Sequence, residues 1–394
     1  MKIAMAVHGR FHAFDLARSL IRAGHDVHLF TNYPAWAVRR FKLTPGSLAS
    51  NWLNAAGMRA ASALGIADSP HIEPQIHEGF GKWAAAEIRK HKPWDFVHIF
   101  SGIALETLQS KYCAKHGVVL VRGSAHIEVQ DQILADEEQR VGLKLKRPSP
   151  WMIRRELQEY SKADRIIVLS TFARESFVAQ GVEKDKLLQV PLGVETTRFR
   201  ASPSTVAERS RRIRSGQPLR ILMSGTLSFR KGLVDLISII RKCPGAVFRF
   251  VGTVPPQERR FIADCHLPLT LIPKVPQFEL PALYADADMF VFPTLEDGFA
   301  VVLAQAAANR LPVLTTTNSS GPDIVTNGRN GWVFPIRQPE MFVDRINWCH
   351  DNRERFATMI EQSETYLPRD WDDVASDLVA QMTRAPVGGE LVEN

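Results

Sequence analysis

Two series of short apolar segments, each separated by helical stretches, follow one another along the chain, and this repetition limits the possible folds most. The first series comprises segments 2–8, 26–30, 96–100, 118–121 and 165–169. The second comprises segments 219–223, 247–252, 269–272, 289–292 and 313–315. Short apolar runs between helices are typical of parallel strands buried on both faces. We therefore predict an α/β chain of two Rossmann-like, doubly wound domains that face each other across a cleft.

The predicted boundary between the two domains lies near residue 200. Segment 203–218 is polar and rich in arginine, and prolines flank it, so we predict a linker or surface segment there. A last helix is predicted from Trp371 to Met382, before a frayed end. The predicted units are an N-terminal domain at 1–200, a second domain at 201–370 and a C-terminal helix with its tail at 371–394.

Composition excludes several classes of protein. Hydrophobic residues make up 45% of the chain and charged residues 23%, as in folded globular proteins rather than disordered ones. No apolar run approaches the roughly 20 residues that a membrane-spanning helix needs. The four cysteines, Cys113, Cys243, Cys265 and Cys349, are far apart, which disfavours a zinc site or a disulfide framework. We expect reduced thiols in a cytoplasmic protein and no metal site.

The positive charge is concentrated in the first half of the chain. Residues 1–200 hold 28 Lys and Arg against 20 Asp and Glu, whereas residues 201–394 hold 21 against 22. This bias suggests an anionic partner for the first half, such as nucleic acid, an anionic membrane surface or a phosphorylated ligand; the alternative is a solvated basic face. Nucleic acid is disfavoured because the excess is diffuse and no recognised binding module occurs.

The first strand-to-helix turn, residues 8–12, lacks the G-x-G-x-x-G spacing of dinucleotide-binding folds. NAD and FAD are therefore not expected there. One glycine, Gly9, would still let the backbone approach a ligand closely.

The corresponding turn of the second half, residues 224–232, is more informative. It contains Gly225, Thr226 and the adjacent cations Arg230 and Lys231, and it opens a predicted helix. Glycine, hydroxyl groups and cations at a helix start are suited to a bound diphosphate. It is not a Walker A loop, and the alternative is a solvated turn.

A second candidate segment follows the predicted strand 289–292. It contains the carboxylates Glu296 and Asp297, then Gly298 and a helix. Gln305 lies eight residues beyond Asp297, about 80° round a helix, so both side chains can face one cleft. The alternative is that the carboxylates only favour the helix N-terminus electrostatically.

Taken in order, four segments resemble the GT-B fold glycosyltransferases of the large retaining family 4 type. This group includes mannosyltransferases, sucrose synthases and bacterial enzymes of polysaccharide and lipid-linked oligosaccharide synthesis. The resemblance implies that the second domain binds the sugar donor, the first domain holds the acceptor, and the last helix returns to the first domain. The matching segments are 163–199, 225–232, 293–306 and 321–333.

The resemblance also implies roles for individual residues. The implied diphosphate-binding residues are Gly9, Gly225, Thr226, Arg230 and Lys231. The implied residues for the donor sugar and nucleotide are Val275, Gly298, Phe299, Ala300 and Gln305. The implied catalytic residues are Asp297, Glu296 and His126.

Three positions depart from the family pattern. Thr226 replaces the family's arginine, and Arg230 is our candidate for the missing cation. Asp297 and Gln305 stand where the family has a pair of glutamates. Gln can still hydrogen-bond a ribose hydroxyl, and Glu296 is an alternative for the first carboxylate.

From these features we expect retaining, metal-independent transfer of a hexose from a nucleoside-diphosphate sugar, with no further cofactor. The expected acceptor is a saccharide or a polyprenyl-diphosphate-linked one, as in bacterial cell-surface polysaccharide synthesis. Basic, aromatic segments at 36–42, 143–147 and 151–155 suggest contact with the inner face of the cytoplasmic membrane. The alternatives are a nucleotide-sugar 2-epimerase of the same architecture and a non-catalytic nucleotide-sugar-binding protein.

Overall fold

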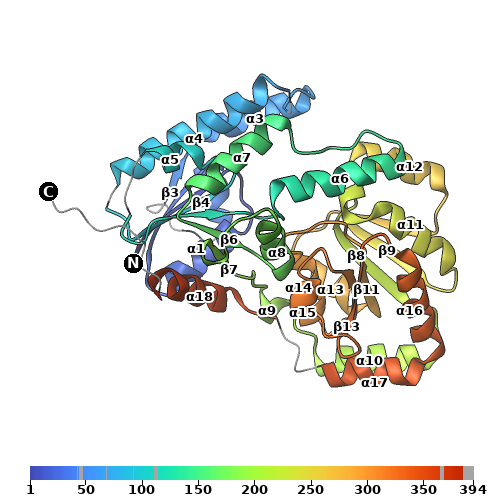
Figure 1. The fold of residues 1–394 in the computed structure, drawn as a ribbon. Coiled ribbons are helices and arrows are strands. Elements are labelled where there is room, and N and C mark those ends of the chain that lie inside the picture. The colour runs from blue at the N-terminus through green and yellow to red at the C-terminus, as the bar shows by residue number, and fades with distance from the viewer. Residues whose placement is uncertain are drawn as a thin grey trace.

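The computed structural model contains two parallel β-sheets with helices packed around them (Figure 1). It describes residues 1–41, 43, 48–67, 69–91, 93–110, 114–363 and 368–384. Cys113 and the predicted frayed end, Pro386 to Asn394, lie outside these residues. Two doubly wound α/β domains were predicted from the sequence, and this fold class is confirmed.

The first sheet has seven strands in the order β3-β2-β1-β4-β5-β6-β7. Ile3 of β1 pairs in parallel with Val27 of β2 on one side and Phe96 of β4 on the other. The strand order therefore reverses beside β1, which places a ligand crevice at the carboxyl end of this sheet. The strands are β1 (Lys2–Val7), β2 (Asp26–Thr31), β3 (Leu48–Ser50), β4 (Phe96–Phe100), β5 (Val118–Val121), β6 (Arg165–Val168) and β7 (Leu187–Gln189).

Most helices of this part of the chain connect the strands and pack around the first sheet, whereas α6 and α9 contact the second domain. Their buried faces pack on strands such as β4, all of whose residues are buried. The helices are α1 (Ala13–Arg22), α2 (Ala35–Val38), α3 (Trp52–Ala63), α4 (Ile72–Lys90), α5 (Leu105–Gln109), α6 (Ile127–Val141), α7 (Pro150–Lys162), α8 (Thr171–Ala179) and α9 (Thr196–Phe199), with 3₁₀ turns η1 (Arg39–Phe41) and η3 (Lys184–Lys186).

The second sheet has six strands in the order β10-β9-β8-β11-β12-β13. Ile221 of β8 lies between Phe248 of β9 and Met289 of β11, so the order reverses beside β8. The strands are β8 (Arg220–Thr226), β9 (Val247–Thr253), β10 (Leu269–Pro273), β11 (Met289–Phe292), β12 (Val313–Thr316) and β13 (Gly331–Phe334). The helices are α10 (Pro203–Arg214), the 3₁₀ turn η4 (Phe229–Lys231), α11 (Leu233–Lys242), α12 (Pro256–Cys265), α13 (Leu280–Ala285), α14 (Val301–Ala308), α15 (Gly321–Ile324), α16 (Pro339–Asp351), α17 (Arg353–Gln362) and α18 (Trp371–Arg384).

Segment 203–218 was predicted to be a linker or a surface segment, and the linker alternative is wrong because most of this segment forms α10. Ser202 caps the helix by accepting a hydrogen bond from the backbone N–H of Thr205, and Pro203 occupies the first turn. The polar composition hid a buried face, on which Arg209 is fully buried. Its guanidinium donates to backbone carbonyls of Tyr284, Ala285, Ala287, Asn309 and Arg310.

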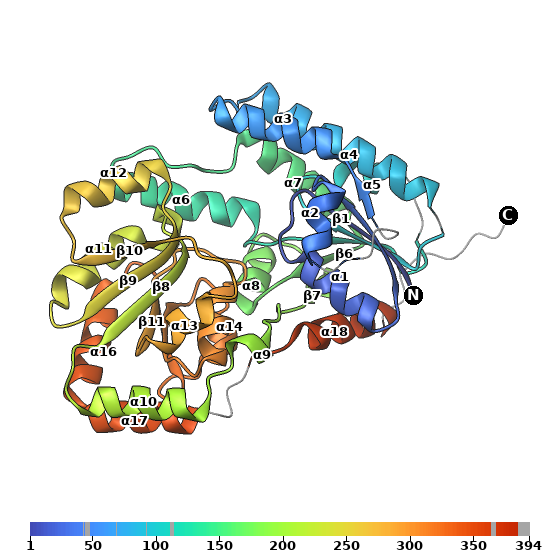
Figure 2. The same ribbon diagram turned by 180° about the vertical axis from the view of Figure 1, so that it is seen from behind.

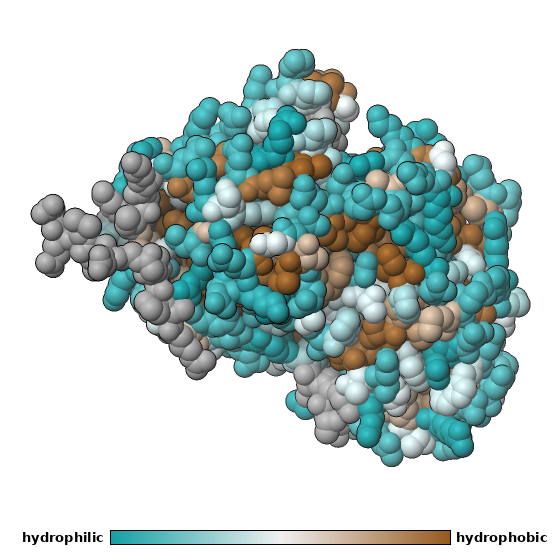
Figure 3. All heavy atoms as spheres, in the orientation of Figure 1, coloured by the Kyte–Doolittle hydropathy of each residue, from teal (hydrophilic) through white to brown (hydrophobic). Residues whose placement is uncertain are grey.

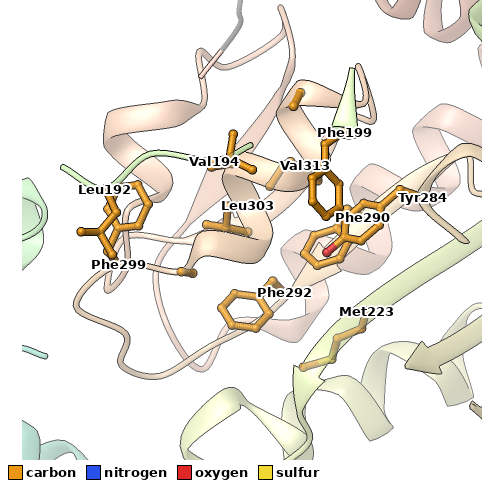
Figure 4. Close-up of a cluster of buried hydrophobic side chains, with 14 of the residues drawn as sticks. Leu192, Val194, Phe199, Met223, Tyr284, Phe290, Phe292, Phe299, Leu303 and Val313 are labelled. Atoms are coloured by element: carbon orange, nitrogen blue, oxygen red, sulfur yellow. The ribbon is translucent and has the colours of Figure 1, made fainter. Parts of the chain in front are cut away.

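The segment that leaves the first domain packs on the core of the second. Figure 4 shows Leu192 beside Phe299, and Phe199 beside Tyr284 and Phe290. The ring of Phe199 meets that of Tyr284 edge-on at 5.7 Å, and Tyr284 stacks on Phe290 at 5.6 Å. The segment that connects the domains is therefore packed on the second domain and is not an unpacked linker.

The last helix, α18, lies beside α1 of the first domain in both views (Figures 1 and 2). Asp372 accepts from Arg22 at 2.7 Å, and Trp371 stacks on His12 with ring centroids 6.4 Å apart. The chain therefore crosses from the second domain back to the first, and two segments join them.

Helix α6 extends from the first domain over the second. Arg140 of α6 donates to Asp235 of α11 at 2.5 Å, and Arg337 lies 3.3 Å from Glu137 of α6. The two domains also meet where Asp323 of α15 accepts a hydrogen bond from the backbone N–H of Thr171 of α8 at 3.0 Å. Figure 3 shows apolar residues in the middle of the face seen in Figure 1, with hydrophilic residues around them. Charged and polar groups of the two domains are thus in direct contact at several places.

Candidate functional site

The two domains enclose a cavity of about 590 Å³ at the carboxyl ends of their strands. The first domain contributes His8, Arg122 and Glu156 to its wall, and the second contributes Arg230 and Gln305, among others. This is where the strand order predicts a ligand site. A smaller cavity of about 290 Å³ adjoins it on the second domain, lined by residues such as Thr226, Arg230, Lys231 and Asp297.

Glycines shape the turn after β8. Gly225 has a φ of +117° and lines the smaller cavity. Gly232 has a φ of +78°, and a Cβ atom there would lie 1.8 Å from the carbonyl oxygen of Pro293. Only glycine therefore lets the turn after β8 approach the turn after β11, which brings Lys231 beside Asp297.

Lys231 is buried at the edge of the smaller cavity. Its Nζ donates to Asp297 Oδ2 at 2.6 Å and to the carbonyl oxygen of Glu296 at 3.1 Å. Burial lowers the pKa of Lys231, the neighbouring Arg230 lowers it further, and Asp297 opposes the shift. Since Asp297 also accepts from the backbone N–H of Phe299 at 3.2 Å, this carboxylate is fixed at the cavity wall.

Glu296 points away from the smaller cavity and into the contact between the domains. It is fully buried and accepts from the backbone N–H of Ala125 at 2.9 Å and from Gln130 Nε2 at 3.2 Å. Arg230 Nη1 lies 3.3 Å from its second oxygen. Of the two predicted carboxylates, Asp297 is therefore the one that faces the cavity, while Glu296 connects Arg230 to the first domain.

At Gly298 the backbones of the two domains lie close together. A Cβ atom there would lie 2.4 Å from the carbonyl oxygen of Gly123 and 2.5 Å from Ser124 Cα. Phe299 and Ala300 follow at the wall of the smaller cavity, and Ala300 is the N-cap of α14. Val301 and Val302 of the first turn also line this cavity, and the first N–H groups of a helix have no partner within the helix.

Gln305 lines the larger cavity with its amide group held in place. Its Oε1 accepts from the Tyr284 hydroxyl at 3.1 Å, and that hydroxyl lies 2.6 Å from Ser224 Oγ. Val275, the predicted base-contacting residue, is partly buried against the core instead, and its neighbour Gln277 lines the cavity.

His126 is not part of either cavity wall. It begins α6, where its Nδ1 accepts from the backbone N–H of Glu128, and its ring packs between Tyr160 and Phe177. Burial, followed by the charge of Arg122, lowers its pKa to about 4. The geometry gives this neutral imidazole a capping role and provides no support for its predicted role in catalysis.

Arg122, which was not predicted, faces the larger cavity from the end of β5. It donates to Glu156 at 3.0 Å and to Gln130 at 2.6 Å. Burial by itself lowers the pKa of Arg122, but neighbouring acidic groups, Glu156 first, raise it above its usual value. This side chain is therefore charged at every working pH.

The turn after β1 contributes a further part of the first-domain wall. Gly9 has a φ of +103° and its N–H donates to Asn32 Oδ1 at 2.8 Å, while His8 and Arg10 on either side line the cavity. His8 Nε2 lies 2.7 Å from Asn54 Oδ1, and burial lowers its pKa. His8 and Arg122 could have been found as polar residues at the carboxyl ends of predicted strands.

A D-x-D triplet, Asp286-Ala287-Asp288, lies just before β11. Arg212 and Arg220 bind these carboxylates at the amino end of that strand. The triplet is therefore structural and lies at the edge of the sheet opposite the cavities.

In the part of the chain that the structure describes, no helix is both long and apolar enough to cross a bilayer.

Family models match both halves of the chain. "Glycosyltransferase Family 4" matches residues 10–198, and "Glycosyl transferases group 1" matches residues 207–366. Together they cover the second sheet, the first sheet apart from β1, and every second-domain residue predicted for the site.

Individual relatives agree with these models. A GDP-mannose-dependent phosphatidylinositol monomannoside mannosyltransferase of Mycobacterium tuberculosis is 28% identical over 232 residues, which are 55% of this chain and 60% of that protein. The putative colanic acid biosynthesis glycosyltransferase WcaL of Salmonella typhimurium is 25% identical over 233 residues, 55% of each chain. The match thus spans a little over half the length of these relatives.

Solved structures share the fold over nearly the whole chain. Sucrose-phosphate synthase from Thermosynechococcus elongatus has a TM-score of 0.72 at 16% identity, covering 96% of this chain and 98% of that one. Anabaena HepE in complex with UDP and glucose has a TM-score of 0.68 at 13% identity, covering 98% and 100%. With both halves matched by family models, the chain belongs to the GT-B glycosyltransferases of the group 1 and family 4 type.

Proposed function

We propose that this chain transfers a sugar from a nucleoside-diphosphate sugar to a saccharide or lipid-linked acceptor in the synthesis of a surface polysaccharide or glycolipid. The observation that carries the proposal is the pair of cations, Arg230 and Lys231, at the wall of a cavity that adjoins the interdomain cleft. Relatives described as a GDP-mannose-dependent mannosyltransferase and a colanic acid glycosyltransferase support it.

The donor diphosphate is the group that these cations suit best. Lys231 has a carboxylate partner, Asp297, and a diphosphate in the smaller cavity would compete with that carboxylate for the ammonium group. The released Asp297 would then lie free to bind the hydroxyls of the donor sugar. Gln305, held by Tyr284, would hydrogen-bond the ribose.

The chemical step requires stabilisation of a leaving nucleoside diphosphate. The bond from the anomeric carbon to the phosphate oxygen breaks, and a bond from that carbon to the acceptor oxygen forms on the same face. The acceptor's hydroxyl proton goes to the leaving phosphate. Arg230, Lys231 and the amides at the start of α14 would stabilise the charge on the departing oxygen, so no metal ion and no enzymic nucleophile are required.

Release of nucleoside diphosphate from a panel of UDP-, GDP- and ADP-sugars tests the proposal. We expect release from one donor class and its loss in Lys231→Ala. Lys242→Ala is the matched control, because Lys242 is exposed at the far end of α11. Binding without release would instead support a non-catalytic binder, and a 2-epimeric sugar product formed without acceptor would support an epimerase.

Retention and metal independence have their own tests. NMR of the product should show the anomeric configuration of the donor, and transfer should persist in the presence of EDTA. An inverted product would contradict same-face attack, and loss of activity on chelation, restored by a divalent cation, would contradict metal independence.

We further propose that the acceptor is reached at a membrane surface. Trp36 of α2 and Trp52 and Leu53 of α3 are 63%, 55% and 66% exposed, and the cations Arg39 and Arg59 lie on the same segments and are also exposed. Exposed aromatics beside cations are suited to anionic headgroups. Salt-sensitive co-sedimentation with vesicles containing phosphatidylglycerol should be lost in a Trp36→Ala, Trp52→Ala double variant; equal sedimentation of the variant would refute this docking face.

A further inference from the structure

A cavity of about 490 Å³ lies on the second domain alone, between the start of β13, α16 and α17. None of its described lining residues belongs to the wall of the larger or the smaller cavity of the candidate site. Helix α16 lies at the edge of the second domain that is farther from the first domain in both ribbon views (Figures 1 and 2). A ligand in this outer cavity would therefore occupy a site separate from that of the proposed reaction.

Arg345 of α16 is held in the outer cavity by two indole rings. Its guanidinium carbon lies 4.7 Å from the ring centroid of Trp332 and 5.3 Å from that of Trp348. The two rings are inclined at 67° to each other, with centroids 5.9 Å apart. Guanidinium groups are attracted to the faces of tryptophan rings, so these rings orient the side chain without a hydrogen bond.

The guanidinium of Arg345 has no acceptor within the described ranges of the chain. It forms no hydrogen bond and no ion pair there, and its buried Nε is unsatisfied. A guanidinium carries five N–H donors in a planar fork, and leaving such donors unpaired costs stability. Since Arg345 lines the outer cavity, a ligand there is the expected source of an acceptor.

The outer cavity has an excess of positive charge. Arg329 and Arg355 add two exposed cations to its wall, and neither pairs with a carboxylate of the described residues. The only carboxylate among the described residues of the wall is Glu354, which accepts from Arg214 at 2.8 and 2.9 Å. Arg214 also binds Glu361. Together with the stacked arginine, four arginines therefore face two carboxylates.

The acidic residues of α16 lie outside the cavity wall. Glu340 pairs with Lys242, and Asp351 lies 3.1 Å from His350. Asp344 does not belong to the lining residues either. The outer cavity is therefore cationic, and the group that it is suited to bind is an anion.

The rest of the wall is suited to a sugar ring that carries this anion. Met359 and the partly exposed ring of Trp348 supply an apolar surface, while Thr358 and Gln362 supply a hydroxyl and an amide group. An aromatic wall with a few polar groups is typical of small-molecule sites of about 300–1,000 Å³. Arginine matches a planar carboxylate through two parallel hydrogen bonds. A sugar acid combines an apolar ring face, hydroxyl groups and a carboxylate.

We propose that the outer cavity binds a carboxylate-bearing saccharide, such as a uronic acid unit of an oligosaccharide. Arg345, oriented by Trp332 and Trp348, binds the carboxylate, and Arg329 and Arg355 supply further positive charge. The proposal goes beyond the proposed function and does not depend on it, because none of these residues has a role in donor binding.

Titration with trigalacturonic acid tests the proposal, followed by tryptophan fluorescence and by calorimetry. Maltotriose, which has three sugar rings and no carboxylate, and triglutamate, which has carboxylates and no sugar ring, are the comparison probes. We expect trigalacturonic acid to bind at least about tenfold more tightly than either.

Variants of the arginines test where the probe binds. The double variant Arg329→Glu, Arg355→Glu should weaken binding by at least about tenfold, because it reverses two charges of the wall without removing a packed side chain. Arg345→Lys should also weaken binding, because it keeps the charge and loses the planar fork. The matched control is Arg259→Glu, Arg260→Glu, which reverses two exposed arginines of α12 outside the cavity and should bind as the parent does.

Each remaining outcome would overturn the proposal. Equal binding of triglutamate would mean that the site recognises carboxylates on any backbone, and equal binding of maltotriose would mean that the charge is not recognised. No binding to the parent, unchanged binding in Arg345→Lys or in Arg329→Glu, Arg355→Glu, or equal weakening in the control would also contradict it. Loss of binding in Lys231→Ala would place the probe in the donor site instead. Release of nucleoside diphosphate is measured separately, so its absence would concern the proposed function alone.

Discussion

The buried carboxylate Glu296 should control how firmly the two domains stay in contact. Glu296→Gln keeps the volume of the side chain but removes its charge. The carboxylate accepts from Ala125 N–H and Gln130 and lies beside Arg230. A hydrogen bond to a charged group contributes about 1.5–3 kcal/mol to stability, and a neutral one contributes about 0.5–1.5 kcal/mol. Replacing the charged acceptor of the Ala125 N–H by a neutral amide therefore costs roughly 1.5 kcal/mol.

The ion pair with Arg230 adds little to this sum. The side chain of Arg230 is 34% exposed, so screening by solvent limits the pair to about 0.5 kcal/mol. These two contributions, without the bond from Gln130, sum to about 2 kcal/mol. That free energy corresponds to local opening that is roughly 30-fold more frequent, since about 1.4 kcal/mol is a factor of ten.

Hydrogen exchange followed by mass spectrometry measures this opening in peptides that span residues 122–130. We expect exchange there to accelerate by about 30-fold in Glu296→Gln. The control is Asp288→Asn, a buried carboxylate bound by Arg212 within the second domain, which should leave these peptides unchanged. Equal exchange in Glu296→Gln and the parent would mean that the cost of burying the charge cancels its bonds, and the reasoning would fail.

Three further predictions follow from other residues. Gly298→Ala should lower sugar transfer by at least about a hundredfold, because its Cβ would force the domains apart at Gly123, whereas Gly245→Ala, with open space around it, should have no effect in the same assay. Gln305→Ala should weaken nucleoside-diphosphate binding by about 1 kcal/mol in calorimetry, and unchanged affinity would remove its proposed contact with the ribose. Burial lowers the pKa of His98 to about 4, so the stability it contributes is present above the unfolded-state pKa and is lost as the pH falls from about 6.5 toward 4. The free energy of unfolding measured in urea should therefore fall by about 2 kcal/mol between about pH 6.5 and 5 because of His98. In His98→Phe the free energy of unfolding should depend less steeply on pH over this range. An unchanged pH dependence in this variant would contradict the effect assigned to His98.

The strands could be predicted because parallel strands buried on both faces leave continuous apolar runs in the sequence. Helix α10 could not, because its buried face is anchored by Arg209, whose partners are carbonyl groups about 75 to 100 residues away. A charged residue in a polar segment gives no local sign that it is buried. The burial of one face of α10 is therefore determined by tertiary packing.

The residues of the candidate site could likewise be predicted only in part. Lys231 and Asp297 belong to motifs with fixed spacing, and the structure brings them within 2.6 Å of each other. The orientation of Glu296 depends on contacts with the first domain, and that of His126 depends on packing in the core of its own domain. The spacing of residues along the sequence carries no information about either set of contacts. The cavity of about 890 Å³ that Leu145 and Gln257 line likewise exists only because segments distant in the sequence meet across the domain boundary.

The most direct test of the account is a thermal-shift screen of the parent protein and Lys231→Ala with UDP, GDP and ADP. A ligand that binds the folded state raises the melting temperature in proportion to its saturation. We predict a clear shift of the parent with one of the three nucleotides and a much smaller shift of Lys231→Ala with the same one. Equal shifts in the two proteins, or no shift with any nucleotide, would contradict the assignment of the second-domain cavity as the donor site.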